Sequence, residues 1–374
     1  MYIESKMNQF EITLRNPDRV LTVAFGEATP EQELSCRHLA AAEWSMPLSK
    51  EDYVEQEKYL SQKPLVSNRG WRLWCLSLLD HPSEVLATCK TIPRELLIRD
   101  VSVVGRAKAY CIASVVTHPQ YRGLGLASRL LEYVSAWLDG PGDAVVSVLY
   151  TSIGDFYERR GWAKLPAIQS TLSWPADFSS MKDGARLPVT NPILSTELLE
   201  LCKQDVRDVE YYFEKLSVQP DEFHVSVLPT ADLISWLHGR SDFIGNRIEG
   251  APPRSHGSIC GAADSWLYWY HDFRKQQLAI QRIRIPQGPS QVHREALAAM
   301  LVDAVEEACR WKLNKVILWE PNAEVLGAMQ ILQGKFNIKS ETLARHNKSV
   351  PSLRWHMGGV KRTTFHFNEF YTWS

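Results

Sequence analysis

The sequence predicts an α/β protein with a mixed, layered sheet (an α+β arrangement) built as two domains. Three observations lead to this prediction. At roughly 150 residues per domain, a chain of 374 residues favours two domains. Short apolar runs alternate with amphipathic helical patterns in both halves of the chain. A segment rich in Pro, Ser, Gly and polar residues, 176–193, lies between the halves and is interpreted as a linker.

In the first half, the apolar pattern predicts strands and helices in the order β-α-α-β-β-β-α-β-α-β. Residues 30–60 have helical patterns, with Pro30 near the first turn. Ser49 and Asp52 have the spacing of a capping box, which predicts that a second helix begins there. A brief helix is expected over IGDFYERR, ending at Gly161. Strand-like runs, rich in Val, Ile, Trp and Cys, cover residues 19–25, 71–79, 85–92, 108–116, 145–150 and 162–174.

Composition and charge exclude several classes of protein. The formal net charge is −1, whereas a nucleic-acid binder usually carries a strongly basic domain. No stretch approaches the roughly 18 apolar residues of a membrane helix, and the N-terminus lacks the pattern of a secretory signal. The seven cysteines form no CxxC pairs, which predicts reduced, buried thiols and no metal site. We therefore expect a cytoplasmic protein with no nucleic-acid or membrane partner.

The stretch HPQYRGLGLASRLL, residues 118–131, carries the strongest functional signal. Gly123 and Gly125 lie between a predicted strand and an amphipathic helix. A P-loop would need a lysine after a glycine, and a dinucleotide-binding fingerprint would need a third glycine where Ser128 stands. The remaining alternatives are a different phosphate ligand or a helix start that merely contains two glycines.

The context of these glycines favours a ligand. Each glycine costs about 1 kcal/mol relative to alanine inside a helix start, so two of them indicate close approach of the backbone to something. Pro119 opens the junction into a loop, and Arg122 adds a cation beside a helix N-terminus whose amides already favour an anion. A pyrophosphate fits such a loop better than a carboxylate, because several amides converge on it.

These residues resemble the acyl-CoA signature of the GNAT N-acetyltransferase superfamily, Arg/Gln-x-x-Gly-x-Gly/Ala between a strand and a helix. The signature maps onto Arg122, Gly125 and Ala127, with Gly123 also in its usual place. A second family landmark is a strand followed by a short helix that holds a tyrosine. It is matched by VLYTSIGDFYERRGW, which contains Tyr157.

The resemblance covers roughly residues 15–175 and implies a GNAT acetyl-CoA-binding catalytic domain there. WSMPLSKEDYVEQE, the tyrosine motif and the aromatic-rich second half are also similar to the fungal lysine N6-acetyltransferase branch of the superfamily. That closer similarity implies free lysine as the acceptor.

The resemblance also implies a mechanism. The strand before the glycines should part from the strand 145–150, and the pantetheine arm of acetyl-CoA should lie in the gap. An amide at Val116 or Thr117 would stabilise the oxyanion as the amine attacks, which makes Val116 a candidate catalytic residue. Residues expected to contact the cosubstrate are Ser114, Val115, Val116, Arg122, Gly123, Leu124, Gly125, Leu126, Ala127 and Ser128.

Tyr157 stands at the family's general-acid position, where it would protonate the departing thiolate; packing alone is the other reading. The sequence names no base. The candidates are His118, Asp155, Glu158, Glu43, Asp52 or a chain of water molecules. Cys111 lies upstream of the expected site and is interpreted as core.

The second half, 194–374, is predicted to be an aromatic-rich α/β domain that covers the acceptor side. Its segments LAIQRIRIP, REALAAMLVDAVEEACRW and KVILWEP repeat the strand–helix–strand order of the first half, but without the glycine turn. If the second half shares the fold, it is a degenerate copy that has lost the phosphate-binding turn and contributes to the shape of the protein, not to its chemistry. In SWLYWYHDF, residues 265–273, alternation predicts one core face and leaves the opposite face open to a ligand role.

The sequence thus supports an acetyl-CoA-dependent N-acetyltransferase with acetyl-CoA as cosubstrate, no metal and a small-molecule amine acceptor, lysine N6 being the best candidate. A non-catalytic acyl-CoA-binding scaffold remains an alternative. So does an acetyltransferase acting on a specialised-metabolite amine or on a protein amine. The oligomeric state is left open.

Overall fold

The computed structural model describes residues 8–15, 18–67, 70–176, 178, 187–286, 288, 290–358 and 362–373. The chain divides into two compact units. The first comprises 1–96, 106–164 and 351–361, and the second comprises 97–105, 165–350 and 362–374. Within the predicted linker, 177 and 179–186 lie outside the described residues.

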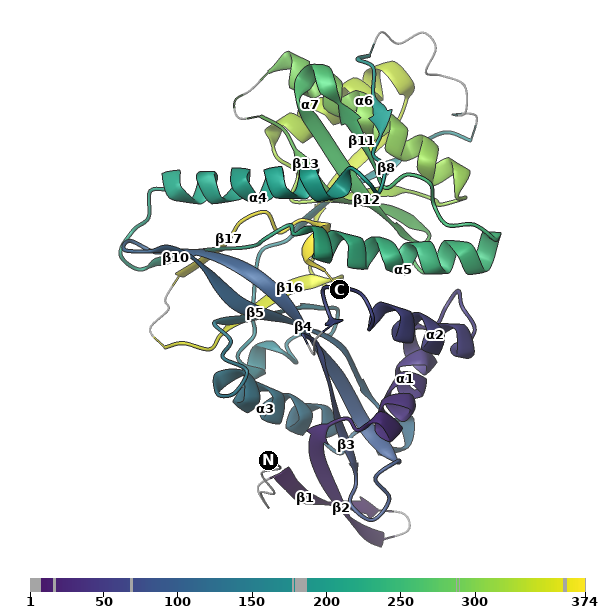
Figure 1. Cartoon of the computed structure of the whole chain (residues 1–374), viewed down its shortest axis with the longest axis vertical. Helices are drawn as coiled ribbons and strands as arrows, with labels where there is room; N and C mark the ends of the chain where they lie inside the picture. Colours follow the sequence, from purple (N-terminus) through teal and green to yellow (C-terminus); the bar gives the residue numbers. More distant parts are fainter. Residues whose placement is uncertain are drawn as a thin grey trace. The chain divides into compact units, whose positions relative to one another are not determined.

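The first unit is built on a mixed sheet with helices on both faces (Figure 1). Its strands follow the order β1-β2-β3-β4-β5-β6-β16-β7. In chain order they are β1 Gln9–Arg15, β2 Asp18–Glu27, β3 Arg72–Leu78, β4 Val85–Arg99, β5 Val104–Thr117, β6 Val146–Thr151, β7 Ala163–Lys164 and β16 Val350–Trp355. The helices are α1 Pro30–Trp44, α2 Lys50–Leu60 and α3 Leu126–Asp139, with short 3₁₀ turns η3 Pro119–Tyr121 and η4 Glu158–Arg160.

Alternation along β3 explains why the sheet is covered on both sides. Trp74 and Leu76 belong to the core formed with α3, which includes Leu130. Leu73 and Cys75 belong to a second cluster, formed with α1. Successive residues of a strand point to opposite faces, so a strand that is buried on both faces reads as the continuous apolar run seen in the sequence.

Helix starts in the first unit follow the predicted capping chemistry. Ser49 is the N-cap of α2, and its Oγ accepts a hydrogen bond from the Asp52 amide at 3.0 Å. Pro30 occupies the first turn of α1, which is capped by Thr29. The prediction of two helical segments between 30 and 60 is confirmed.

Three local predictions were wrong. β1 lies in a stretch that was interpreted as polar, although Phe10, Ile12 and Leu14 alternate with polar residues and pack on the core. The helix expected over IGDFYERR is reduced to the three-residue turn η4, although Gly161 ends it as predicted with a φ of +90°. The single strand expected over 162–174 is two strands, β7 and β8 Ile168–Ser173, with Pro166 between them. Proline has no amide to donate to a ladder, so the strand ends there.

The C-terminal part of the chain contributes β16 to the sheet of the first unit, between β6 and β7. The His356 amide donates to the Val145 carbonyl at 2.9 Å, and His356 Nε2 lies 2.8 Å from Ser147 Oγ. Arg354 Nη2 donates to Asp139 at the end of α3 at 2.9 Å. The sheet of the first unit therefore includes a strand that lies almost 200 residues after β7 in the chain.

The second unit contains a seven-stranded sheet in the order β15-β8-β14-β13-β12-β11-β9. Strand β10 Glu222–Val227 pairs in parallel with β17 Arg362–Phe365. The other strands are β9 Asn191–Pro192, β11 Gly257–Cys260, β12 Ser265–Asp272, β13 Gln277–Arg284, β14 Val316–Trp319 and β15 Lys339–Ala344. The helices are α4 Leu198–Lys215, α5 Ala231–Glu249, α6 Gln291–Arg310 and α7 Ala323–Phe336, with α6 and α7 packed side by side (Figure 1).

The internal repeat is confirmed by topology. β13, α6 and β14 form a parallel strand–helix–strand unit, as β5, α3 and β6 do in the first unit. The open face considered for SWLYWYHDF does not exist, because every residue of β12 is buried. Aromatic side chains on both faces of this central strand fill the core of the second unit.

Three buried histidines lie together in the core of the second unit. The rings of His238 and His256 stack with centroids 4.0 Å apart, and His256 contacts the edge of His271. His238 Nε2 lies 2.7 Å from Gln281 Oε1, and His271 Nε2 lies 3.1 Å from Glu307 Oε1. Burial lowers the pKa of His238 well below the ordinary histidine value and lowers the pKa of His271 as well.

These lowered pKa values predict acid sensitivity. Below pH about 6.5, these histidines are protonated in the unfolded chain but stay neutral in the folded protein. The free energy of unfolding therefore falls by about 1.4 kcal/mol for each such histidine and each pH unit of acidification. Urea unfolding at pH 7.5 and 5.5 should show a smaller loss of stability on acidification for His238→Gln than for wild type. Equal losses in the two proteins would contradict this assignment.

Candidate active site

The strands β5 and β6 stop pairing before β5 reaches the glycine loop. They pair in parallel over only three positions, Ala109–Cys111 against Val146–Val148. Further along β5, Ser114 has a φ of +53°, which is uncommon for a residue other than glycine. This left-handed residue interrupts the regular strand, and the backbone beyond it diverges from β6.

The residues after Ser114 alternate between the two faces of the sheet. Val116 is buried against Cys36 and Leu39 of α1. Val115 packs on the opposite core, which contains Leu126 and Tyr157. The backbone of Val115 and Val116 thus lies beyond Cys111, the last residue of β5 that pairs with β6. The sequence predicted an oxyanion-stabilising amide in this part of the strand. Cys111 is fully buried, as expected for core.

The glycine loop connects β5 to α3. Gly123 and Gly125 have φ values of +83° and +76°, so both positions require the left-handed backbone that glycine adopts most easily. A Cβ at either position would meet no atom of the chain within 4 Å. The backbone here borders open space, which leaves room for a ligand to approach it closely.

The first turn of α3 begins at this loop. Gly125 is the N-cap and provides no side-chain hydrogen bond to the helix amides. Leu126 is buried in the core, whereas Leu124 and Ala127 are half-buried. The amides of an uncapped helix start attract an anion, because they carry partial positive charge.

Arg122 is anchored on the α1 side of the loop. Its Nε donates to the Thr117 carbonyl at 3.2 Å, and its guanidinium forms an ion pair with Glu43. Glu43, which the sequence offered as a base, therefore carries a neutralising partner. The Arg122 side chain remains half-exposed, so it is also accessible to an anionic ligand.

Tyr157 lies in the core beside the separated strands and is 7% exposed. Its ring makes edge contacts with Phe156, at a centroid distance of 5.0 Å, and with Trp162, at 6.5 Å. Burial raises the pKa of Tyr157, so the phenol keeps its proton at every physiological pH. The hydroxyl is therefore in its donor form, although the raised pKa also makes it a weaker acid than a tyrosine in water.

The other candidate bases have structural partners. Asp155 and Glu158 both pair with Lys164, and this lysine lowers the pKa of Asp155. The Asp52 carboxylate accepts from Ser49 Oγ at 2.9 Å at the start of α2. The ring of His118 caps η3, with Nδ1 3.4 Å from the Gln120 amide. These contacts explain all four residues structurally and leave the base unassigned.

One contact at the site was missed by the sequence analysis. Arg160 donates to Ser128 Oγ in the first turn of α3, and its guanidinium stacks on the Phe156 ring at 3.8 Å. Phe156 and Arg160 both belong to the tyrosine motif, in which the run Glu-Arg-Arg could have drawn attention to a functional arginine. Arg160 joins the two motifs that the sequence had recognised separately.

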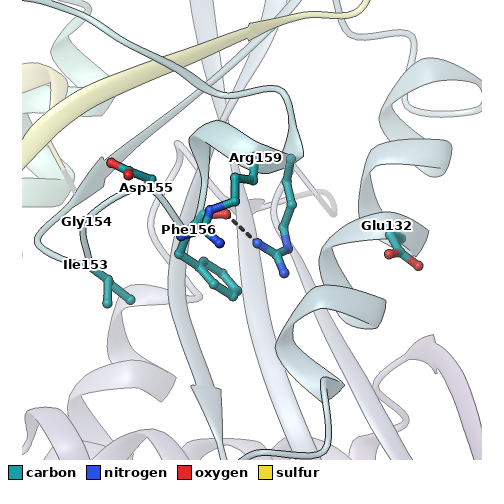
Figure 2. Close-up of a pocket in the computed structure, with 7 residues that line it drawn as sticks. Glu132, Ile153, Gly154, Asp155, Phe156 and Arg159 are labelled. Atoms are coloured by element: carbon teal, nitrogen blue, oxygen red, sulfur yellow. Dashed lines mark hydrogen bonds between the residues drawn. The ribbon is translucent and has the colours of Figure 1, made fainter.

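A cavity of about 510 Å³ adjoins this contact. Figure 2 shows the loop after β6, with Ile153 and Gly154 on one side and Glu132 of α3 on the other. The dashed line marks the hydrogen bond from Arg160 to the Phe156 carbonyl. The lining combines the guanidinium groups of Arg159 and Arg160 with the Phe156 ring and with two carboxylates, Glu132 and Asp155.

Comparison with known proteins identifies the class. Residues 36–165 match the family model described as Acetyltransferase (GNAT) domain, and residues 171–374 match the LYC1 GNAT-like C-terminal domain. The second match covers more than half of the chain, which therefore belongs to the LYC1-like family of GNAT proteins. The protein is an acetyltransferase with two GNAT-type domains.

Individual relatives agree with this class. A Yarrowia lipolytica protein named "Lysine acetyltransferase" is 24% identical over 338 residues, covering 79% of this chain and 84% of that protein. The solved GCN5-related N-acetyltransferases of Kribbella flavida and Anabaena variabilis share the fold. Their TM-scores are 0.52 and 0.53, with 16% and 14% identity. They cover 89% and 90% of this chain, and 71% and 73% of their own.

Three further findings concern metal binding, membrane spanning and disulfide bonds. The described residues include no group of three or more His, Cys, Asp or Glu side chains arranged to hold a metal ion. Among the same residues, no helix is both long and apolar enough to cross a membrane. All seven cysteines are free thiols.

The left-handed backbone of the glycine loop predicts a stability cost for alanine. Gly123→Ala and Gly125→Ala should each lower the free energy of unfolding by about 1 kcal/mol, because an L-residue is strained at these φ values. Gly26→Ala is the matched control, because its Cβ also meets no atom within 4 Å and its φ lies outside that region. Thermal unfolding measures all three, and an equal loss at Gly26 would contradict the explanation.

Proposed function

We propose that the protein transfers the acetyl group of acetyl-CoA to the N6 amine of free lysine by direct attack. The observation that carries this proposal is the separation of β5 from β6 beside a left-handed glycine loop at the start of α3. A gap between parallel strands that opens onto uncapped helix amides suits a thin arm ending in a pyrophosphate.

The residues present fit acetyl-CoA, whose thioester supplies the activated acetyl group. The amides from Gly123 to Ser128 would bind the pyrophosphate, with Arg122 as a cation at the rim. The backbone of Ser114, Val115 and Val116 would accept the pantetheine arm as an additional strand edge. The cavity beside Phe156 and Arg160, about 510 Å³, offers space for the nucleotide end.

Two groups would assist the chemical step. The amide of Val116 or Thr117 would donate to the oxyanion that develops when the amine attacks the carbonyl. As the C–S bond breaks, Tyr157, which burial keeps protonated, would give its proton to the departing thiolate. The nitrogen would lose its own proton to water as the new C–N bond forms. Direct attack needs no nucleophilic side chain, since holding the amine next to the thioester already removes much of the entropic barrier.

Lysine is proposed as the acceptor because the Yarrowia relative is named for it. Purified protein, acetyl-CoA and single amines should release free thiol, with free lysine giving a kcat/KM at least tenfold above ornithine, spermidine and a lysine-containing peptide. Preference for the peptide would identify a protein acetyltransferase. Binding of CoA without turnover of any amine would instead support a scaffold, and either result would contradict the proposal.

Replacing Tyr157 tests the acid role. Tyr157→Phe should lower kcat about 100-fold, the usual contribution of a general acid, while the affinity for CoA changes little. Tyr133→Phe is the matched control, since this α3 residue packs against the same core and stacks on Phe25 at 4.7 Å. If both variants lose activity equally, the phenol of Tyr157 has no special part in the reaction.

A further inference from the structure

A network of hydrogen bonds joins four side chains of the first unit, Asp139 at the end of α3, Ser147 on β6, Trp162 after η4 and His356 after β16. Asp139 Oδ1 lies 2.5 Å from His356 Nδ1, and His356 Nε2 lies 2.8 Å from Ser147 Oγ. Trp162 Nε1 donates to the same Ser147 Oγ at 3.0 Å. The network therefore connects the segment after β16 with the segment after η4.

The donor and acceptor roles in this network are fixed by its two ends. An indole nitrogen can only donate a hydrogen bond, and an ionised carboxylate can only accept one. Burial acts to raise the pKa of Asp139, but hydrogen bonds from His356 and Arg354 lower it below its ordinary value, so this carboxylate is ionised. His356 Nδ1 therefore carries the proton that Asp139 accepts, which leaves Nε2 as an acceptor. Ser147 accepts from Trp162 and donates its own proton to that Nε2.

The imidazole of His356 is held in its neutral form. Two charged groups face it, Asp139 of α3 and Arg354 of β16, whose Nη1 lies 3.2 Å from Nδ1. Burial lowers the pKa of His356, Asp139 opposes this change and Arg354 adds to it. A second proton, on Nε2, would also leave the buried hydroxyl of Ser147 without its acceptor.

Three members of the network, Ser147, His356 and Asp139, have the hydrogen-bond order of a hydrolytic triad. They cannot act as one, because Ser147 has no exposed surface and its Oγ already accepts from the indole of Trp162. A substrate carbonyl therefore has no access to this hydroxyl. What the network does is fix the position of Trp162.

Trp162 in turn constrains Tyr157 at two points. Its amide donates to the Tyr157 carbonyl at 3.1 Å, and its indole meets the Tyr157 ring edge-on at a centroid distance of 6.5 Å. The indole itself is fully buried, and the guanidinium of Arg354 lies over it, 5.6 Å from the ring centroid. Movement of Trp162 would therefore displace both the backbone and the ring of Tyr157.

We propose that this hydrogen-bond network positions Tyr157 for proton transfer by holding the indole of Trp162. Ser147 and His356 are then positioning residues of the acetyl-transfer site, although neither touches a reacting atom. This inference rests on the proposed function, since the group that is positioned is its proton donor. It makes the placement of Tyr157 depend on a segment that follows it by almost 200 residues.

Tyrosine labelled with ¹³C at Cζ tests the placement of Tyr157 without any turnover. The resonance of Tyr157 is the one that disappears in Tyr157→Phe. Ser147→Ala should shift this resonance, because Trp162 loses its acceptor and its ring current then falls differently on the phenol. Ser135→Ala is the matched control, since this buried serine of α3 takes no part in the network, and it should leave the resonance in place.

Kinetics test the consequence for the reaction. Ser147→Ala should lower kcat about tenfold and leave the KM for acetyl-CoA unchanged, because a misplaced proton donor slows the chemical step and not binding. In the Tyr157→Phe background, the same change should cost less than about twofold, because the group that it positions is gone. His356→Asn keeps a donor for Asp139 but is too short to reach Ser147. It should show the same pattern, and it replaces Ser147→Ala if that variant does not fold.

The proposal is overturned if the Tyr157 resonance stays in place in both variants. It is also overturned if Ser147→Ala costs as much in the Tyr157→Phe background as in wild type, which would show a purely structural role. Wild-type protein that turns over no amine would contradict the proposed function instead. The resonance of Tyr157 would in that case still decide whether the network positions it.

Discussion

The separation of two parallel strands is the constraint on which the site depends. β5 and β6 are held together by three paired positions at their amino ends, and the left-handed Ser114 then breaks the strand. The same divergence brings the backbone of Val115 and Val116, the start of α3 and the ring of Tyr157 to one place. A continuous ladder would instead keep β5 paired with β6 as far as the glycine loop.

The two GNAT-type domains reuse one topology with different chemistry. In the first unit, the glycine loop leaves open space beside its backbone and an uncapped helix start. In the second, Glu369 occupies the β13 edge, and the guanidinium groups of Arg282 and Arg284 on β13 are each paired with two carboxylates. Loss of the glycine turn in the second unit therefore accompanies a strand amide, that of Ile283, which already donates to a carboxylate of the chain.

The sequence predicted the parts of the site that depend on local rules. The two left-handed positions required glycine, the starts of α1 and α2 followed from Pro30 and Ser49, and the repeat in the second half was visible as periodicity. The sequence did not show which strands pair with each other or which distant side chains meet. No strand was predicted at β16, and nothing local in VPSLRW indicates that this segment inserts beside β6, some 200 residues earlier in the chain. The Arg160–Ser128 contact was missed for the same reason, since it joins segments 32 residues apart.

The central claim is that the gap between β5 and β6 holds the cosubstrate. A crystal structure of the protein with CoA measures this most directly. We expect the pyrophosphate within hydrogen-bonding distance of the amides from Gly123 to Ser128, the pantetheine arm along Ser114 to Val116, and the thiol close to the Tyr157 hydroxyl. CoA bound in the second unit, or with its thiol far from Tyr157, would contradict the account.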